Sequence, residues 1–188
     1  MKILVTESQY KKILREEKEQ KIFRVPGLDF FHENKWEAWK ILQKVLEERG
    51  NPPYTIGGSL DLEFTSIESL GNLTSVGGYL DLRNTPIESL GNLISVGGWL
   101  SLEGASIKSL GNLQSVGEFL WLSRSSIKSL GNLQSVGGDL LLGNTPIEFL
   151  GNLQSVGGNL LLKRTPLSKM YTEKQIRQMV DVGGDIFL

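Results

Sequence analysis

Two aspartates, Asp61 and Asp81, come closest to a pair that could do chemistry. They stand 20 residues apart in two copies of the same Leu-Asp-Leu phrase, so we expect their carboxylates to stack if the copies lie side by side. Stacked carboxylates can bind Ca²⁺ or act as an acid/base pair. Two residues further on, the charge alternates from copy to copy, in the order Glu63, Arg83 and Glu103. Such a ladder neutralises the acids, so we interpret both aspartates as solvated surface charges and predict no metal site.

The rest of the sequence offers no other catalytic set. His32 is the only histidine and the chain has no cysteine, which excludes a histidine-based metal cluster, a thiolate zinc site and a histidine-containing triad within one chain. The Gly-Gly pairs, such as Gly77-Gly78, are not followed by the Lys-Ser or Lys-Thr of a phosphate-binding loop. They recur at a fixed interval, which is typical of structural corners. We therefore predict that the protein is not an enzyme and needs no cofactor.

The balance of charge and hydropathy narrows the range of partners. The chain has 188 residues, with 20 basic and 21 acidic side chains and a net charge of −1. Without a basic surplus, nucleic acid is not expected as a partner. No apolar stretch approaches the roughly 20 residues of a membrane span, and the run Ile3-Leu4-Val5 is too short for the core of a signal peptide. We expect a cytoplasmic protein with no signal peptide and no membrane attachment.

A 20-residue period organises most of the chain. Each full repeat begins with Val-Gly, at Val76, Val96, Val116, Val136 and Val156, and a diverged copy begins at Ile56. Counted from this start, the fifth and seventh residues are leucine in every copy, as in Leu80 and Leu82. Alternation with period two predicts a strand whose leucines point inward. The constant period predicts stacked units with a parallel sheet, and 20 residues leave little room for a helix on the return path. This favours a β-rich repeat solenoid of about six coils.

The repeat resembles the leucine-rich repeat superfamily. Its Gly-Gly-x-Leu-x-Leu and Leu-x-Ser-Val-Gly-Gly phrases are most similar to receptor L-domain repeats, over residues 56–167. The resemblance implies protein recognition or scaffolding and supplies no catalytic residues. The usual repeat carries asparagine three residues after the second strand leucine, where this chain has Thr65, Thr85, Ala105, Ser125, Thr145 and Thr165. A ladder of hydroxyl groups could satisfy the backbone there in place of asparagine, except at Ala105.

Both ends of the array are expected to carry helical caps, because terminal coils would expose the aliphatic columns. Asn34-x-x-Glu37 reads as a capping box that opens an amphipathic helix before the first repeat, and Thr172-x-x-Gln175 opens a short helix after the last. Val182–Leu188 then repeats the strand phrase. The predicted organisation is an N-terminal helix and linker or strap (1–33), a capping helix (34–55), the solenoid (56–167), and a capping helix with a final strand (168–188).

The first nine residues resemble the N-terminal tag of many otherwise unrelated tailed-bacteriophage proteins. This resemblance implies a viral origin, and hence the cytoplasm of a bacterial host, but it implies no activity. Within the same segment, Thr6-x-x-Gln9 predicts a first helix over about residues 7–18.

Positions four and six of the repeat point outward and carry a band of aromatic and aliphatic side chains. The band comprises Tyr79, Trp99, Phe119, Trp121, Leu141, Leu161 and Phe187. A monomer rarely exposes so large an apolar patch without using it, and aromatic anchors on a rigid sheet are typical of interface hot spots. We predict that the band is the partner-binding site, and that replacing Trp99 or Trp121 leaves thermal stability nearly unchanged.

Other roles for the band are open at this level. The strap or first helix of the same chain could cover it, sugar rings could stack on it, or it could form a homodimer face. A homodimer through the C-terminal edge strand is also compatible with the sequence, because an unpaired strand invites association. The predicted function is non-catalytic recognition of a protein, with a structural or virion-associated spacer and a carbohydrate-binding protein as alternatives.

Overall fold

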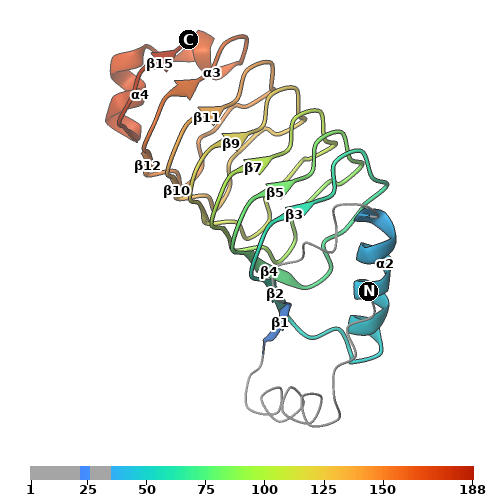
Figure 1. The fold of residues 1–188 in the computed structure, drawn as a ribbon. Helices are drawn as coiled ribbons and strands as arrows, with labels where there is room; N and C mark the ends of the chain where they lie inside the picture. Colours follow the sequence, from blue (N-terminus) through green and yellow to red (C-terminus); the bar gives the residue numbers. More distant parts are fainter. Residues whose placement is uncertain (1–21, 26–34) are drawn as a thin grey trace.

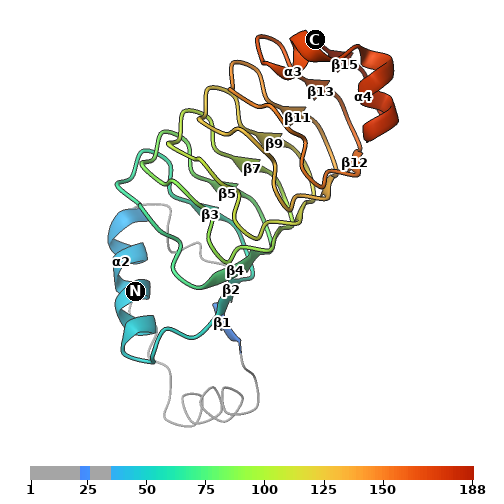
Figure 2. The ribbon, with the colours of Figure 1, turned by 180° about the vertical axis from the view of Figure 1, so that it is seen from behind.

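The repeats fold into a β-solenoid, seen in a computed structural model that describes residues 22–25 and 35–188 (Figure 1). Each repeat contributes one short strand to each of two parallel sheets, which form two sides of the coil (Figure 2). Steps of 20 residues lead from Ile56 to Val156, and a longer step of 26 residues leads to Val182. The array makes about five turns.

The two sheets differ in the part of the repeat that forms them. Sheet A has eight strands, in the spatial order β1 (Phe23–Val25), β2 (Tyr54–Ile56), β4 (Leu73–Val76), β6 (Ser95–Val96), β8 (Ser115–Val116), β10 (Ser135–Val136), β12 (Ser155–Val156) and β14 (Asp181–Val182). Sheet B has seven, in the order β15 (Ile186–Phe187), β13 (Leu160–Leu161), β11 (Leu140–Leu141), β9 (Leu120–Trp121), β7 (Leu100–Ser101), β5 (Leu80–Asp81) and β3 (Leu60–Asp61). Equivalent residues of successive coils pair directly, so the sequence period becomes a spatial one.

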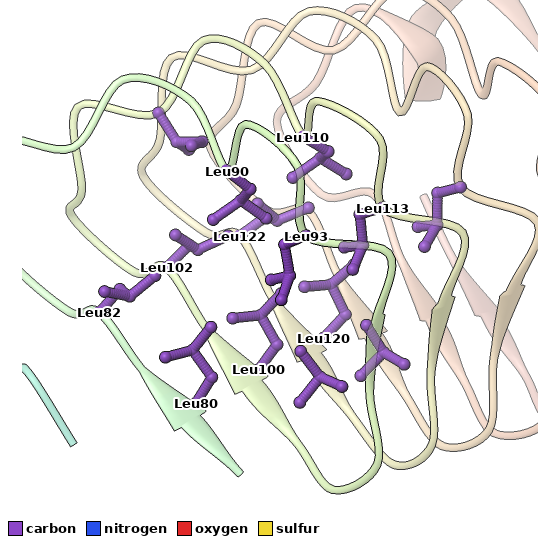
Figure 3. Close-up of a cluster of buried hydrophobic side chains, with 14 of the residues drawn as sticks. Leu80, Leu82, Leu90, Leu93, Leu100, Leu102, Leu110, Leu113, Leu120 and Leu122 are labelled. Carbon is purple, nitrogen blue, oxygen red and sulfur yellow. The ribbon is translucent and has the colours of Figure 1, made fainter. Parts of the chain in front are cut away.

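Aliphatic columns fill the space between the sheets. The leucines of the fifth and seventh repeat positions, from Leu60 to Leu160 and from Leu62 to Leu162, have no exposed surface. Leucines of the fifteenth and eighteenth positions, such as Leu90 and Leu93, meet them from the return path (Figure 3). The predicted inward orientation is therefore confirmed, and burial of these columns supplies the main favourable term in folding.

Glycines mark the corners for two different physical reasons. Gly91 and Gly131 have a φ of 57°, a left-handed conformation that glycine adopts without strain. Gly117 is needed because neighbouring coils approach closely. Its N–H donates to the Val96 carbonyl at 2.9 Å, and a Cβ there would overlap the carbonyl oxygen of Gly97.

The hydroxyl ladder forms at the threonines. Oγ1 of Thr85 donates to the carbonyl three residues earlier at 2.7 Å, and Thr145 and Thr165 make the same bond at the same distance. Ser125 does not continue the ladder, because its buried Oγ has no hydrogen-bond partner among the described residues. The buried side chain of Ala105 offers no hydroxyl. Two carbonyls in the series, those of Leu102 and Leu122, therefore lack the hydroxyl bond that the equivalent carbonyls have at the threonines.

Ala105→Thr is expected to raise the free energy of unfolding by about 0.5–1.5 kcal/mol, the net value of a typical intramolecular hydrogen bond. Thr85 in the adjacent coil indicates that the corner accommodates a threonine. Urea denaturation of the variant and of Ala105→Val measures the effect, since valine has nearly the shape of threonine without its hydroxyl. An equal gain from valine would assign the effect to packing and contradict the hydrogen-bond explanation.

The helix before the first repeat is α2 (Lys35–Glu47), which lies at the N-terminal end of the array (Figure 1). It buries Trp39 and Leu46 against the core. Nε2 of Gln43 on this helix donates to the Tyr54 hydroxyl at 3.1 Å, and that hydroxyl donates to the Leu70 carbonyl at 2.8 Å. Burial raises the pKa of Tyr54, so the phenol keeps its proton and remains a donor.

The longer step near the C-terminus contains α3 (Leu167–Met170) and α4 (Glu173–Met179). The predicted capping box is confirmed: the Thr172 hydroxyl accepts from the Gln175 N–H, and the Gln175 side chain accepts from the Thr172 N–H. Ile176 is fully buried and anchors α4 to the array. No helix in the described ranges is long and apolar enough to cross a membrane.

One expectation is corrected at Phe23–Val25, because this part of the predicted linker or strap is a strand. It forms β1, which pairs in parallel with β2 and extends sheet A. This described part of the segment lies at an edge of sheet A and not over the band on sheet B. The predicted helix over 7–18, the opening at residues 1–9 and His32 lie outside the described residues.

Candidate functional site

The outer face of sheet B carries all seven residues of the predicted band. Inward leucines at the fifth and seventh positions leave positions four and six on the outside. At position six the strands pair without a shift and form what we call the apolar row, which consists of Trp121, Leu141, Leu161 and Phe187. Position four adds Tyr79, Trp99 and Phe119 in three successive coils. Neighbouring strands are about 4.8 Å apart, so the band is continuous.

Exposure is greatest in the coils near the middle and the C-terminal end of the array. Phe119, Trp121 and Phe187 are 48, 40 and 39% exposed, while Leu141 and Leu161 are half-buried. Removing apolar surface of this kind from water is favourable. Covering this face with a complementary apolar surface would therefore be favourable, and the fold would not have to change.

Tyr79 and Trp99 form a stacked pair within the band. Their ring centroids are 4.4 Å apart and their planes differ by 1°, because equivalent positions of adjacent coils are held one strand spacing apart. Each ring thus covers one face of the other, and both side chains are half-buried. The prediction that Trp99 can be replaced without loss of stability is therefore revised, since an aromatic pair contributes about 0.5–1.5 kcal/mol beyond its buried area.

Two polar residues of the same face are buried, against expectation. Asp81 and Ser101 pair across β5 and β7 at the sixth position, and each is only 2% exposed. The sequence pattern predicted their place on the outer face but not their burial. Period-two alternation indicates which face a residue lies on, but not how much of its surface the neighbouring side chains bury. The Ser101 Oγ has no hydrogen-bond partner among the described residues.

Arg83 compensates the buried charge of Asp81. Its Nε lies 2.9 and 3.0 Å from the two carboxylate oxygens of Asp81, and its Nη2 lies 2.6 Å from Asp81 and 2.5 Å from Glu63. The hydrogen bond to Asp81 raises the pKa of the Arg83 guanidinium. The neutralising contact predicted between positions six and eight is confirmed for this arginine.

Asp61, Glu63 and Asp81 have carboxylate oxygens within 4.8 Å of one another, a geometry that could hold a cation. The guanidinium of Arg83 already supplies positive charge between two of them. The interpretation of Asp81 as a solvated charge is wrong, because it is buried and ion-paired. Arg83 ties Asp81 and Glu63 into an ion-paired cluster, and we assign it no metal.

Charged residues border the C-terminal half of the face in an order that sequence analysis missed. We call Glu118, Asp139 and Asp185, each of which lies just before the sheet B strand of its coil, the acidic flank. The basic flank follows the row and consists of Arg124, Lys163 and Arg164. Lys163 Nζ lies 5.6 Å from the centroid of the Phe187 ring, within cation–π range. The individual charges are visible in the sequence, before and after the residues of the row. Their separation into two flanks becomes visible only when the coils are stacked.

The C-terminal edge of the array is only partly open. Arg177 on α4 donates from Nη1 to the Val182 carbonyl at 2.8 Å and from Nη2 to the Gly184 carbonyl at 2.9 Å. Val182 is the last residue of β14 and Gly184 follows it. The equivalent carbonyls of the preceding coil, those of Val156 and Gly158, accept from Gly183 and Gly184, so the guanidinium occupies acceptors that a further coil would use. β15 is the terminal strand of sheet B. A homodimer through the C-terminal edge strand would therefore have to use β15.

The outer face of sheet A has a different character. A shallow groove of about 590 Å³ runs along it, lined by the repeated Ser-Val-Gly segments from Ser75 to Gly157 and by Asp181 and Gly183. Its side chains are small and it offers no aromatic anchor. Of the two sheet faces, the outer face of sheet B has the side chains that interfaces use.

No protein-family model, curated protein or solved structure matches this chain.

Proposed function

We propose that this protein is a non-catalytic recognition module that docks a partner protein on the outer face of sheet B. The observation that carries the proposal is the partly exposed apolar row with Phe119 beside it, held on a scaffold of fully buried leucine columns. A rigid face loses little conformational entropy on binding, which favours affinity. The Phe119 and Trp121 side chains are the anchors, and the remaining residues of the band provide shape.

Protein is favoured over carbohydrate as the partner because of the Tyr79–Trp99 stack. A sugar ring stacks on an aromatic ring face, and each of these rings has one face covered by the other. We further propose a leucine-rich-repeat-like architecture in which α2 and the α3–α4 pair cap the columns. Buried Leu46 on α2 and buried Ile176 on α4 support that role, because each adds an apolar side chain to the core at one end.

Trp121→Ser is expected to weaken binding of the partner by about 2 kcal/mol, the scale of a hot-spot residue, with the melting temperature nearly unchanged. The matched control is Phe149→Ser. Phe149 is 62% exposed but lies on the return path, away from sheet B. Immobilised wild type and both variants are incubated with the same bacterial lysate, and the bound proteins are quantified by mass spectrometry.

Support comes from a protein that wild type and Phe149→Ser retain equally and that Trp121→Ser loses, followed by titration calorimetry with that purified protein. Equal loss with both variants would mean that the contact is non-specific. Equal retention by all three would exclude the outer face of sheet B as the docking surface.

A further inference from the structure

The apolar row has a direction and a length that any partner must match. Its four residues lie on neighbouring strands β9, β11, β13 and β15, in steps of about 4.8 Å along the solenoid axis. The strands cross this axis, and all of them run in the same direction. In every coil, the residues that precede the row in the chain therefore lie on one long side of it, which we call the entering side. The residues that follow the row lie on the other long side, the leaving side.

This common direction separates the charges. The acidic flank lies on the entering side and the basic flank on the leaving side. Among the described residues, Glu118, Asp185 and Arg164 take part in no ion pair, and the 3.7 Å contact of Arg124 with Glu103 leaves the Arg124 side chain 74% exposed. The face therefore presents an apolar centre with uncompensated negative charge on one side and positive charge on the other.

Such a face is complementary to itself under one particular rotation. If two copies meet face to face about a two-fold axis parallel to the apolar row, each row lies against its counterpart and each acidic flank lies opposite a basic flank. A two-fold axis parallel to the strands would instead place acid against acid. Like charges across an interface are strongly unfavourable, and a two-fold axis makes the same surface serve both partners.

We propose that the outer face of sheet B binds the same face of a second copy, with the two-fold axis parallel to the solenoid axis. The inference rests on the proposed function, since it names the first protein that this docking face recognises. Trp121 lies near the axis and meets its own counterpart. Glu118 and Arg124 each stand three residues from Trp121, on opposite sides, so Glu118 of one copy faces Arg124 of the other.

A charge-reversal cycle tests this pairing. Sedimentation equilibrium of the full chain is expected to show a dimer, and Glu118→Arg and Arg124→Glu are each expected to weaken it about tenfold or more, because each places like charges together at two symmetric positions. The double variant E118R/R124E is expected to restore the dimer. Thermal melts of all variants identify any loss of folding. Failure of the double variant to restore dimerisation would overturn the proposed pairing.

The absence of cysteine from the chain allows the axis to be tested independently. Leu141→Cys places one thiol near the proposed axis in each copy, and mild oxidation should cross-link the dimer in high yield. Phe149→Cys, off the face, should not cross-link. A dimer that withstands both charge reversals and gives no Leu141→Cys cross-link would assign association to the β15 edge and overturn the proposal.

The two proposals fail in different ways. A chain that is monomeric at every concentration, but still loses a captured protein on Trp121→Ser, would overturn self-association and leave the docking function standing. A monomer whose captured proteins do not respond to Trp121→Ser would overturn both.

Discussion

Replacing Leu122 by alanine is expected to lower the free energy of unfolding by about 2–5 kcal/mol. Leu122 has no exposed surface and stands in the middle of its column, with Leu102 and Leu142 in the adjacent coils. The lost methyl groups leave a cavity that cannot collapse easily, because the hydrogen-bonded coils above and below fix the spacing. Urea denaturation followed by circular dichroism measures the change.

The adjacent residue provides the control. Trp121 precedes Leu122 in the chain but points to the outer face, where it is 40% exposed. Trp121→Ser should therefore change the free energy of unfolding much less than Leu122→Ala, although it removes the larger side chain. If the two variants were equally destabilised, the assignment of inner and outer faces on sheet B would be wrong.

Gly117→Ala is expected to destabilise the protein by about 3 kcal/mol, the upper end of the usual range for overpacking. The added Cβ would overlap the carbonyl oxygen of Gly97 in the preceding coil, and that oxygen belongs to the backbone, so no side-chain rotation relieves the clash. The equivalent glycines at positions 97 and 137 stack in the same row. A shift at one coil would therefore disturb its neighbours.

Gly131→Ala separates this clash from the effect of backbone conformation. Gly131 has a φ of 57°, but a Cβ there meets no atom within 4 Å, so only the left-handed conformation is penalised, by about 1–2 kcal/mol. Thermal melts of the two variants should place Gly117→Ala clearly lower. The reverse order would show that the coils can move apart at Gly117.

The solenoid was predictable because its signals are local and repeated. Period-two leucines, such as Leu80 and Leu82, fix which way each strand faces, and the constant interval fixes the register between strands. The capping box at Thr172 is equally local. The facing of each strand can be read within one coil, and the register can be read from any two successive coils.

Features that depend on contacts between coils were harder to predict from the sequence. The burial of Asp81 and Ser101 depends on side chains from neighbouring strands, and the role of Arg177 depends on where α4 lies relative to β14. Phe23–Val25 pair with β2 although each residue stands 31 positions before its partner, as Val25 does before Ile56, and no 20-residue period links them. The separated flanks on sheet B are likewise a property of the stack and not of any one repeat.

The unbroken register has a consequence for how such a protein can change over time. Because each interior coil meets its neighbours through the same repeat positions, duplication or loss of one 20-residue unit by recombination would keep equivalent positions paired. The length of the solenoid can therefore vary in whole units at little cost to the fold. Each such event would add or remove one strand of the outer face, so the length of the surface can evolve separately from its chemistry.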